Sequence, residues 1–165
     1  MTLMKNNKDI IFINFLSVVI ALWTYYYFNE KPEMPIAILA TGVSVCFGIR
    51  QYKIEHDKMF KELFQSFNEK YDLKFNNALS QIVNARNENM SYQLTSIEKD
   101  LIIDYINLCA EEYLWFKKGR IDDDVWLAWE QGMLYFFKLE PIKSCVENEK
   151  MQKASYYGLF EKLNL

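Results

Sequence analysis

The sequence predicts an all-α protein in which two membrane-spanning helices precede a soluble helical domain. Two uncharged apolar runs lie within the first 50 residues, and in the remainder apolar residues recur at three- and four-residue steps, the period of an amphipathic helix. Turn-forming residues are few, with 5 Gly and 3 Pro among 165 residues, which disfavours an all-β fold. We expect residues 1–50 to form a transmembrane hairpin and residues 51–165 a cytosolic α-helical domain.

The first apolar run, Ile10–Phe28, has 19 residues without a charged side chain. This is close to the ~20 residues with which a helix crosses a bilayer. Its far end carries Trp23 and the three tyrosines Tyr25–Tyr27, residue types that are enriched at the membrane–water interface. A cleavable signal peptide is the competing interpretation. Bulky aromatic residues, rather than small ones, follow the apolar stretch, and this favours a helix that stays in the membrane.

The second apolar run, Met34–Ile49, is 16 residues long, so the second predicted span covers about residues 34–50. Arg50 closes the run, and its long side chain can reach back to the membrane interface. The linker Asn29–Glu33 is short enough for a tight turn between two helices, and Pro35 suits the first turn of the second helix. A buried helix of the soluble domain is the alternative interpretation.

Positive charge flanks the outer ends of the two spans. Lys5 and Lys8 precede the first span, whereas Arg50, Lys53 and Lys58 follow the second; the connecting segment holds one Lys and two Glu. Because cytoplasmic loops are enriched in Lys and Arg, we expect both termini on the cytoplasmic side of a bacterial inner membrane.

Three small residues, Ala40, Ser44 and Gly48, share one face of the second span at four-residue spacing. Small residues allow helix backbones to approach closely, so this series predicts a helix-packing face. Two interpretations remain open: the series packs against the first span of the same chain, or it mediates self-association of several hairpins. Because two spans cannot enclose a pore, any membrane activity requires an oligomer.

The remaining residues, 51–165, contain 15 Lys and Arg and 19 Asp and Glu, a net charge of −4 that gives no support to DNA binding. We expect a long amphipathic helix from about Tyr52 to Val83, followed by a polar, Asn-rich loop over Asn84–Gln93. No Gly or Pro lies between Arg50 and Asp57, so this helix is expected to continue from the second span.

The later helices have recognisable start and stop signals. Residues Thr95–Glu98 match a capping box, and Gly119 after two lysines predicts the end of the helix that the box opens. The next helix is expected to begin at the aspartates Asp122–Asp124, and Pro141 to open a shorter one. A last helix over about Gln152–Leu163 completes a domain of about five helices.

Candidate catalytic and metal-binding residues are scarce. His56 is the only histidine, the three cysteines lack the spacing of zinc ligands, and no Gly-rich phosphate-binding loop occurs. The carboxylates Glu111 and Glu112 are adjacent, and neighbouring side chains on a helix point in different directions. We therefore expect no enzyme activity, no catalytic residue, no metal and no cofactor.

Binding of a small anion, by contrast, needs only a few well-placed donors. Lys117, Lys118 and Arg120 lie beside two aromatic residues at a predicted helix end, a combination that binds phosphates and stacks on bases. Arg86 in the Asn-rich loop provides a second group of donors. These four side chains are the candidate ligand-binding residues, with a capped helix end and a solvated loop as the respective structural alternatives.

Two parts of the chain are similar to known proteins: the two spans and one stretch of the helical domain. The stretch comprises Tyr105–Tyr113, Trp115–Gly119, Ile121, Asp122, Val125, Trp126 and Trp129. With these residues the chain resembles the small membrane effectors of type III CRISPR systems, in which two spans precede a cytosolic domain that binds cyclic tetra-adenylate as a tetramer. The same stretch is also similar to a broad bacterial family of small membrane-anchored helical domains without an assigned function.

The resemblance implies an antiphage effector. A homo-oligomer, expected to be a tetramer, binds cyclic tetra-adenylate with its cytosolic domains, and the transmembrane hairpins then disrupt the lipid bilayer. Two alternatives from other functional classes stay open: a membrane-anchored adaptor that binds a protein partner and no small ligand, and a holin-like toxin that acts without a signal.

Overall fold

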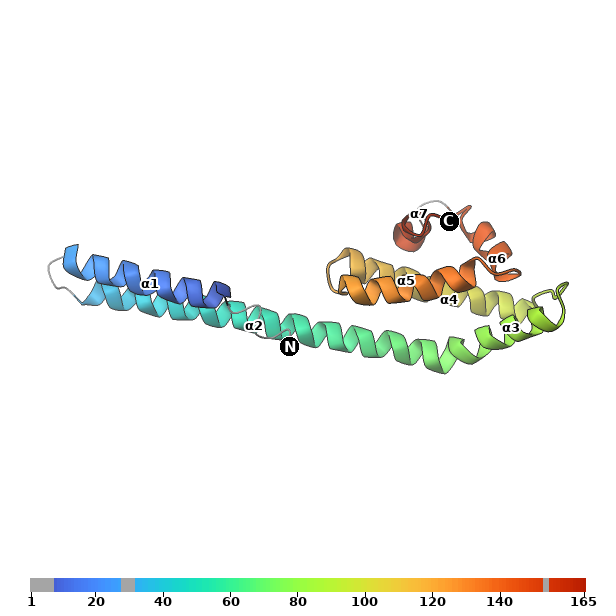
Figure 1. Cartoon of the computed structure of the whole chain (residues 1–165), viewed down its shortest axis with the longest axis horizontal. Helices are drawn as coiled ribbons and strands as arrows, with labels where there is room; N and C mark the ends of the chain where they lie inside the picture. The colour runs from blue at the N-terminus through green and yellow to red at the C-terminus, as the bar shows by residue number, and fades with distance from the viewer. Residues whose placement is uncertain (1–7, 28–31, 153–154) are drawn as a thin grey trace. The chain divides into compact units, whose positions relative to one another are not determined.

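The computed structural model describes residues 8–27, 32–152 and 155–165, and the chain divides into two compact units, Met1–Lys58 and Met59–Leu165. Within the described ranges the regular elements are helices and none is a strand, which confirms the all-α class (Figure 1). The sequence placed the domain boundary at residue 50, whereas the compact units meet at Lys58.

The first unit contains helix α1 (Lys8–Tyr27) and the beginning of helix α2 (Glu33–Lys70). Two helical stretches, Ile10–Tyr27 and part of Glu33–Glu88, are long and apolar enough to cross a membrane. In the most apolar window of each, only 11% of the residues are buried, whereas the core helix of a soluble domain is mostly buried. This exposure is typical of helices that face lipid. Lys5, Phe28 and most of the linker between the expected spans lie outside the described residues.

Small side chains form the contact between α1 and α2, which lie side by side (Figure 1). Ala21, Gly42 and Cys46 are buried there. A Cβ atom on Gly42 would lie 2.7 Å from the Cβ atom of Ser17, and the Cys46 Sγ atom lies 3.8 Å from the carbonyl oxygen of Ile10. The two backbones can approach this closely because Gly42 has no side chain.

The series Ala40, Ser44 and Gly48 does not contribute to this contact. All three residues are exposed, and no atom lies within 4 Å of a Cβ atom built on Gly48. The interpretation in which the series packs against the first span is therefore wrong. Its role in self-association stays a prediction.

The second unit is an assembly of short helices around helix α4 (Ser96–Lys117). Besides the end of α2, its elements are the π-helical segment η1 (Tyr71–Asn76), α3 (Asn77–Glu88), α5 (Asp123–Phe137), α6 (Ile142–Glu149), the 3₁₀ segment η2 (Ser155–Gly158) and α7 (Leu159–Lys162). Each α-helix from α3 to α7 contributes fully buried side chains to one core, among them Leu79, Ile102, Phe137, Ile142 and Leu159.

The boundaries of α4 confirm the signals in the sequence. The Thr95 side chain accepts a hydrogen bond from the backbone N–H of Glu98, and the Glu98 side chain accepts one in return from the backbone N–H of Thr95. At the other end, the N–H groups of Gly119 and Arg120 donate to the carbonyls of Phe116 and Trp115, and Gly119 has a φ of 67°. This is a Schellman motif, which favours glycine at its left-handed position.

Two sequence predictions about helix boundaries are wrong, whereas the expected continuity of the long helix from the second span is confirmed. The expected loop over Asn84–Gln93 begins later, because α3 continues to Glu88. The long helix is continuous through this region, but η1 interrupts its α-helical geometry, and the helix axis bends between α2 and α3 (Figure 1). The expected last helix over Gln152–Leu163 is replaced by η2 and the four-residue α7, since Tyr156 and Tyr157 adopt positive φ; residues 153–154 lie outside the described ranges.

Candidate ligand-binding site

A polar cavity of about 350 Å³ lies in the second unit, between the end of α3, the loop that follows it, the start of α4 and the start of α6. This volume is within the range of ~300–1,000 Å³ that is typical of small-molecule sites. The lining residues are Arg86, Met90, Ser91, Tyr92, Gln93, Leu94, Lys99, Glu140, Pro141, Ser144, Cys145 and Asn148.

Hydrogen bonds to Glu98 hold the loop wall of this cavity in place. The Tyr92 hydroxyl donates to Glu98 Oε1 at 2.6 Å, and the backbone N–H and hydroxyl of Thr95 donate to Oε2 at 2.8 and 2.7 Å. Partial burial opposes ionisation of Glu98, but these hydrogen bonds outweigh it and lower the pKa of the carboxyl group. The Glu98 carboxylate is therefore ionised and fully engaged at neutral pH, and it fixes the loop to α4.

Two cations from different helices line the cavity. Arg86, on α3, is half-buried and donates from Nη1 to Asn87 Oδ1 at 3.2 Å; Lys99, on α4, is exposed. Neither side chain forms an ion pair with a carboxylate anywhere in the described part of the chain. Two cations in a lining that contains one carboxylate, Glu140, favour an anionic ligand.

The first turn of α6 forms another wall. No side chain caps this turn, although the Ser144 hydroxyl donates to Glu140 Oε2 at 2.9 Å. Burial, aided by Glu149 and Glu140, raises the pKa of the Cys145 thiol, and the Lys99 ammonium opposes this shift only in part. Cys145 is therefore protonated at neutral pH, so the cavity combines groups suited to binding rather than to nucleophilic attack.

The structure does not bring the four candidate ligand-binding residues together. Arg86 lines the cavity, whereas Lys117, Lys118 and Arg120 lie at the opposite end of α4 from Lys99. At 1.5 Å per helical residue, roughly 27 Å separate Lys99 from Lys117. Within one chain, these four cations therefore cannot form a single binding site.

The contacts at the end of α4 are those of a capped helix terminus. The Lys117 Nζ atom donates to the carbonyl oxygen of Tyr157 at 3.4 Å and lies 6.0 Å from the centre of the Tyr113 ring. The Lys118 Nζ atom lies 4.8 Å from the centre of the Trp115 ring. These cation–π contacts and the helix dipole account for the lysines without a ligand.

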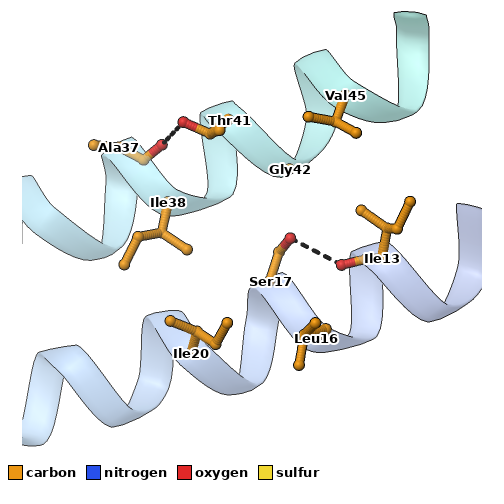
Figure 2. Close-up of a pocket in the computed structure, with 9 residues that line it drawn as sticks. All are labelled: Ile13, Leu16, Ser17, Ile20, Ala37, Ile38, Thr41, Gly42 and Val45. Atoms are coloured by element: carbon orange, nitrogen blue, oxygen red, sulfur yellow. Dashed lines mark hydrogen bonds between the residues drawn. The ribbon is translucent and has the colours of Figure 1, made fainter. Parts of the chain in front are cut away.

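A second cavity, of about 430 Å³, lies between α1 and α2 and is almost entirely apolar (Figure 2). Its two hydroxyl groups are satisfied within their own helices, because Ser17 donates to the carbonyl oxygen of Ile13 and Thr41 to that of Ala37, both at 2.8 Å. Among the described residues that line it, no side-chain polar group remains to recognise a polar ligand. The cavity suits an apolar occupant.

Acidic residues do not form a metal site in the described part of the chain, where no three potential ligands cluster. Glu111 is exposed and lies 3.4 Å from the Lys70 ammonium. Glu112 is buried, with 7% of its surface exposed, and burial, aided by Glu111 and opposed by Lys70, raises its pKa to about 8. The two carboxylates thus occupy different environments, as expected for adjacent positions on a helix.

Sequence reasoning found Arg86 but missed the other polar residues around the cavity, chiefly Lys99, Glu140, Ser144 and Asn148. No motif connects them, because they come from α4, from the turn before α6 and from α6, and meet only in the packed domain. Lys99 directly follows the capping-box residue Glu98, so the box was the one available signal that its position is fixed. No protein-family model matches the chain, and neither does any curated protein or solved structure.

Proposed function

We propose that this chain is a membrane-anchored effector that binds a cyclic oligoadenylate, cyclic tetra-adenylate, at the cavity around Arg86. The two long apolar helices form a transmembrane hairpin with both termini in the cytoplasm of a bacterial inner membrane. A domain of about five helices then faces the cytoplasm. The observation that carries the proposal is a cavity lined by two cations, Arg86 and Lys99, that form no ion pair with a described carboxylate, in a domain whose net charge is negative.

The size of the cavity favours a shared ligand. Its volume of about 350 Å³ is at the lower end of the range for small-molecule sites, so it suits one nucleotide better than a ring of four. Four chains around one cyclic tetra-adenylate give each nucleotide its own cavity, since a fourfold ligand matches a cyclic tetramer. Arg86 and Lys99 of each chain then contribute to a ring of positive charge.

Disruption of the bilayer requires that ligand binding in the helical domain changes the arrangement of the spans. Helix α2 (Glu33–Lys70) belongs to both compact units, so it provides a direct mechanical connection. The exposed residues Ala40, Ser44 and Gly48 supply the face through which several hairpins associate. Rearrangement of associated hairpins on ligand binding then permeabilises the bilayer, which is how the effector halts phage growth.

Titration calorimetry of the full chain in detergent micelles tests this proposal, followed by dye release from proteoliposomes. We expect binding of cyclic tetra-adenylate at about one ligand per four chains, and dye release only when the ligand is present. Arg86→Gln weakens ligand binding and dye release. Lys143→Gln, a substitution at an exposed position outside the cavity, changes neither binding nor release.

Two other outcomes identify the alternatives. Dye release without any ligand indicates an ungated holin-like toxin. A folded chain that neither binds cyclic tetra-adenylate nor releases dye is the result expected of a membrane-anchored adaptor.

A further inference from the structure

We infer that Arg86 and Lys99 act as a pair that binds one phosphate group of a nucleotide in the polar cavity. The inference deepens the proposed function and rests on it for the identity of the complete ligand. The phosphate chemistry follows from the cavity itself, in which a planar guanidinium and a compact ammonium come from α3 and α4. Charge-assisted hydrogen bonds from such a pair are the usual way in which proteins hold phosphate.

The start of α6 strengthens this assignment. Pro141, Ser144 and Cys145 place the first turn of this eight-residue helix in the cavity wall, and no side chain caps it. The N-terminal end of a helix carries partial positive charge, so it adds to the attraction of Arg86 and Lys99 for an anion.

Glu140 provides the one carboxylate in the lining, and this carboxylate favours a nucleotide over inorganic phosphate. Its Oε2 atom accepts a hydrogen bond from Ser144, and a carboxylate can accept further ones. A nucleotide can place hydroxyl or amino donors on Glu140 away from its phosphate group, whereas inorganic phosphate, although it carries O–H groups, must bring its own negative charge beside Glu140 to donate to it. Asn148 provides both a donor and an acceptor for the same purpose. The cavity therefore fits a nucleotide better than a free phosphate ion.

The capping box fixes the backbone position of Lys99 before a ligand binds. Glu98, the preceding residue, binds Thr95 and Tyr92, which fixes the first turn of α4 and the loop wall together. Little backbone ordering is then needed when a ligand binds, and this favours affinity.

The test compares three probes on the full chain in detergent micelles by titration calorimetry: adenosine monophosphate, adenosine and inorganic phosphate. We expect adenosine monophosphate to bind more tightly than either of its parts. Arg86→Gln and Lys99→Gln each weaken its binding about tenfold or more, because each removes a charge-assisted contact. Lys99→Arg keeps the positive charge and retains binding, and Lys143→Gln serves as the matched control outside the cavity.

The outcomes separate this inference from the proposed function. Binding of adenosine monophosphate that depends on both cations, without any binding of cyclic tetra-adenylate, supports the phosphate pair and overturns the proposed ligand. Binding of cyclic tetra-adenylate that is unaffected by Lys99→Gln overturns the pair and leaves the proposed function standing. Equal binding of adenosine and adenosine monophosphate also overturns it. Circular dichroism establishes that each variant is folded, which is expected because Lys99 is exposed.

Discussion

Gly42 on α2 faces Ser17 on α1 so closely that a Cβ atom on Gly42 would lie 2.7 Å from the Cβ atom of Ser17. Real Cβ atoms do not approach other carbons to this distance, so even one methyl group must push the helices apart. The contact between the two apolar helices thus depends on the absence of a side chain at one position.

Gly42→Ala is therefore expected to loosen the pairing of α1 with α2. Overpacking of this kind costs about 1–3 kcal/mol. Cys46, which is buried in the same contact, reports the loosening: its alkylation by a maleimide in detergent micelles, located by mass spectrometry, becomes faster. Gly48→Ala is the matched control, because no atom lies within 4 Å of a Cβ atom at that position. Equal alkylation rates in the two variants would contradict this packing.

The same contact shows why the sequence alone did not identify the face that packs within the chain. Gly42 and Cys46 are small and lie four residues apart, and so do Ala40, Ser44 and Gly48. Both sets match the small-residue pattern, because this pattern describes a single helix and contains no information on the helix that packs against it. Only the position of Ser17 opposite Gly42 decides between them, and that position depends on how two helices meet.

The exposed series Ala40, Ser44 and Gly48 is expected to mediate contacts between chains. Gly48→Ile places a branched side chain on this face and should weaken self-association by about 1 kcal/mol or more, which is about fivefold. Light scattering or cross-linking of the full chain in detergent micelles measures the loss of oligomer. Leu39→Ile, at an exposed position on another face of the helix, should leave the oligomer intact. If both variants lose it equally, the series is not the interface.

The capping box at the start of α4 is expected to stabilise the second unit and the cavity together. Thr95→Ala removes the hydroxyl that bonds the backbone N–H of Glu98, at a cost of about 1 kcal/mol. Ser96→Ala changes a hydroxyl at the next position, which does not cap the helix, and should cost less. Urea unfolding followed by tryptophan fluorescence compares the two variants. The box is irrelevant to stability if their midpoints coincide.

This box also marks the limit of what sequence could predict. Signals confined to a few residues, such as Thr95 with Glu98 or Gly119 after two lysines, act through local hydrogen bonds and are confirmed. The cavity has no local signal, because Arg86 and Glu140 lie 54 residues apart in the chain and meet only through the packing of α3, α4 and α6. The π-helical segment Tyr71–Asn76 was missed for a similar reason, since its apolar spacing is also that of an α-helix.

The buried carboxyl group of Glu112 is expected to make the second unit less stable as the pH rises. Its pKa is about 8 in the folded chain, against 4.5 for an ordinary glutamate, chiefly because burial disfavours the charge. Between these two values the folded state binds more protons than the unfolded state, so the free energy of unfolding falls as the pH increases. The free energy of unfolding falls by at most about 1.4 kcal/mol per pH unit, and it stops falling once the pH exceeds the pKa of Glu112 in the folded chain.

Glu112→Gln should remove this slope, because an amide stays neutral at every pH and has nearly the same shape. Urea unfolding at about pH 6 and about pH 9 measures it, and we expect the stability of the variant relative to the native chain to be greater at the higher pH. Glu111→Gln is the control: this neighbour is exposed and pairs with Lys70 at 3.4 Å, an arrangement worth about 0–1 kcal/mol. The Glu111 variant should therefore keep most of the native pH dependence. Identical slopes in both variants would mean that Glu112 is already ionised in the folded chain and that α4 tolerates its charge.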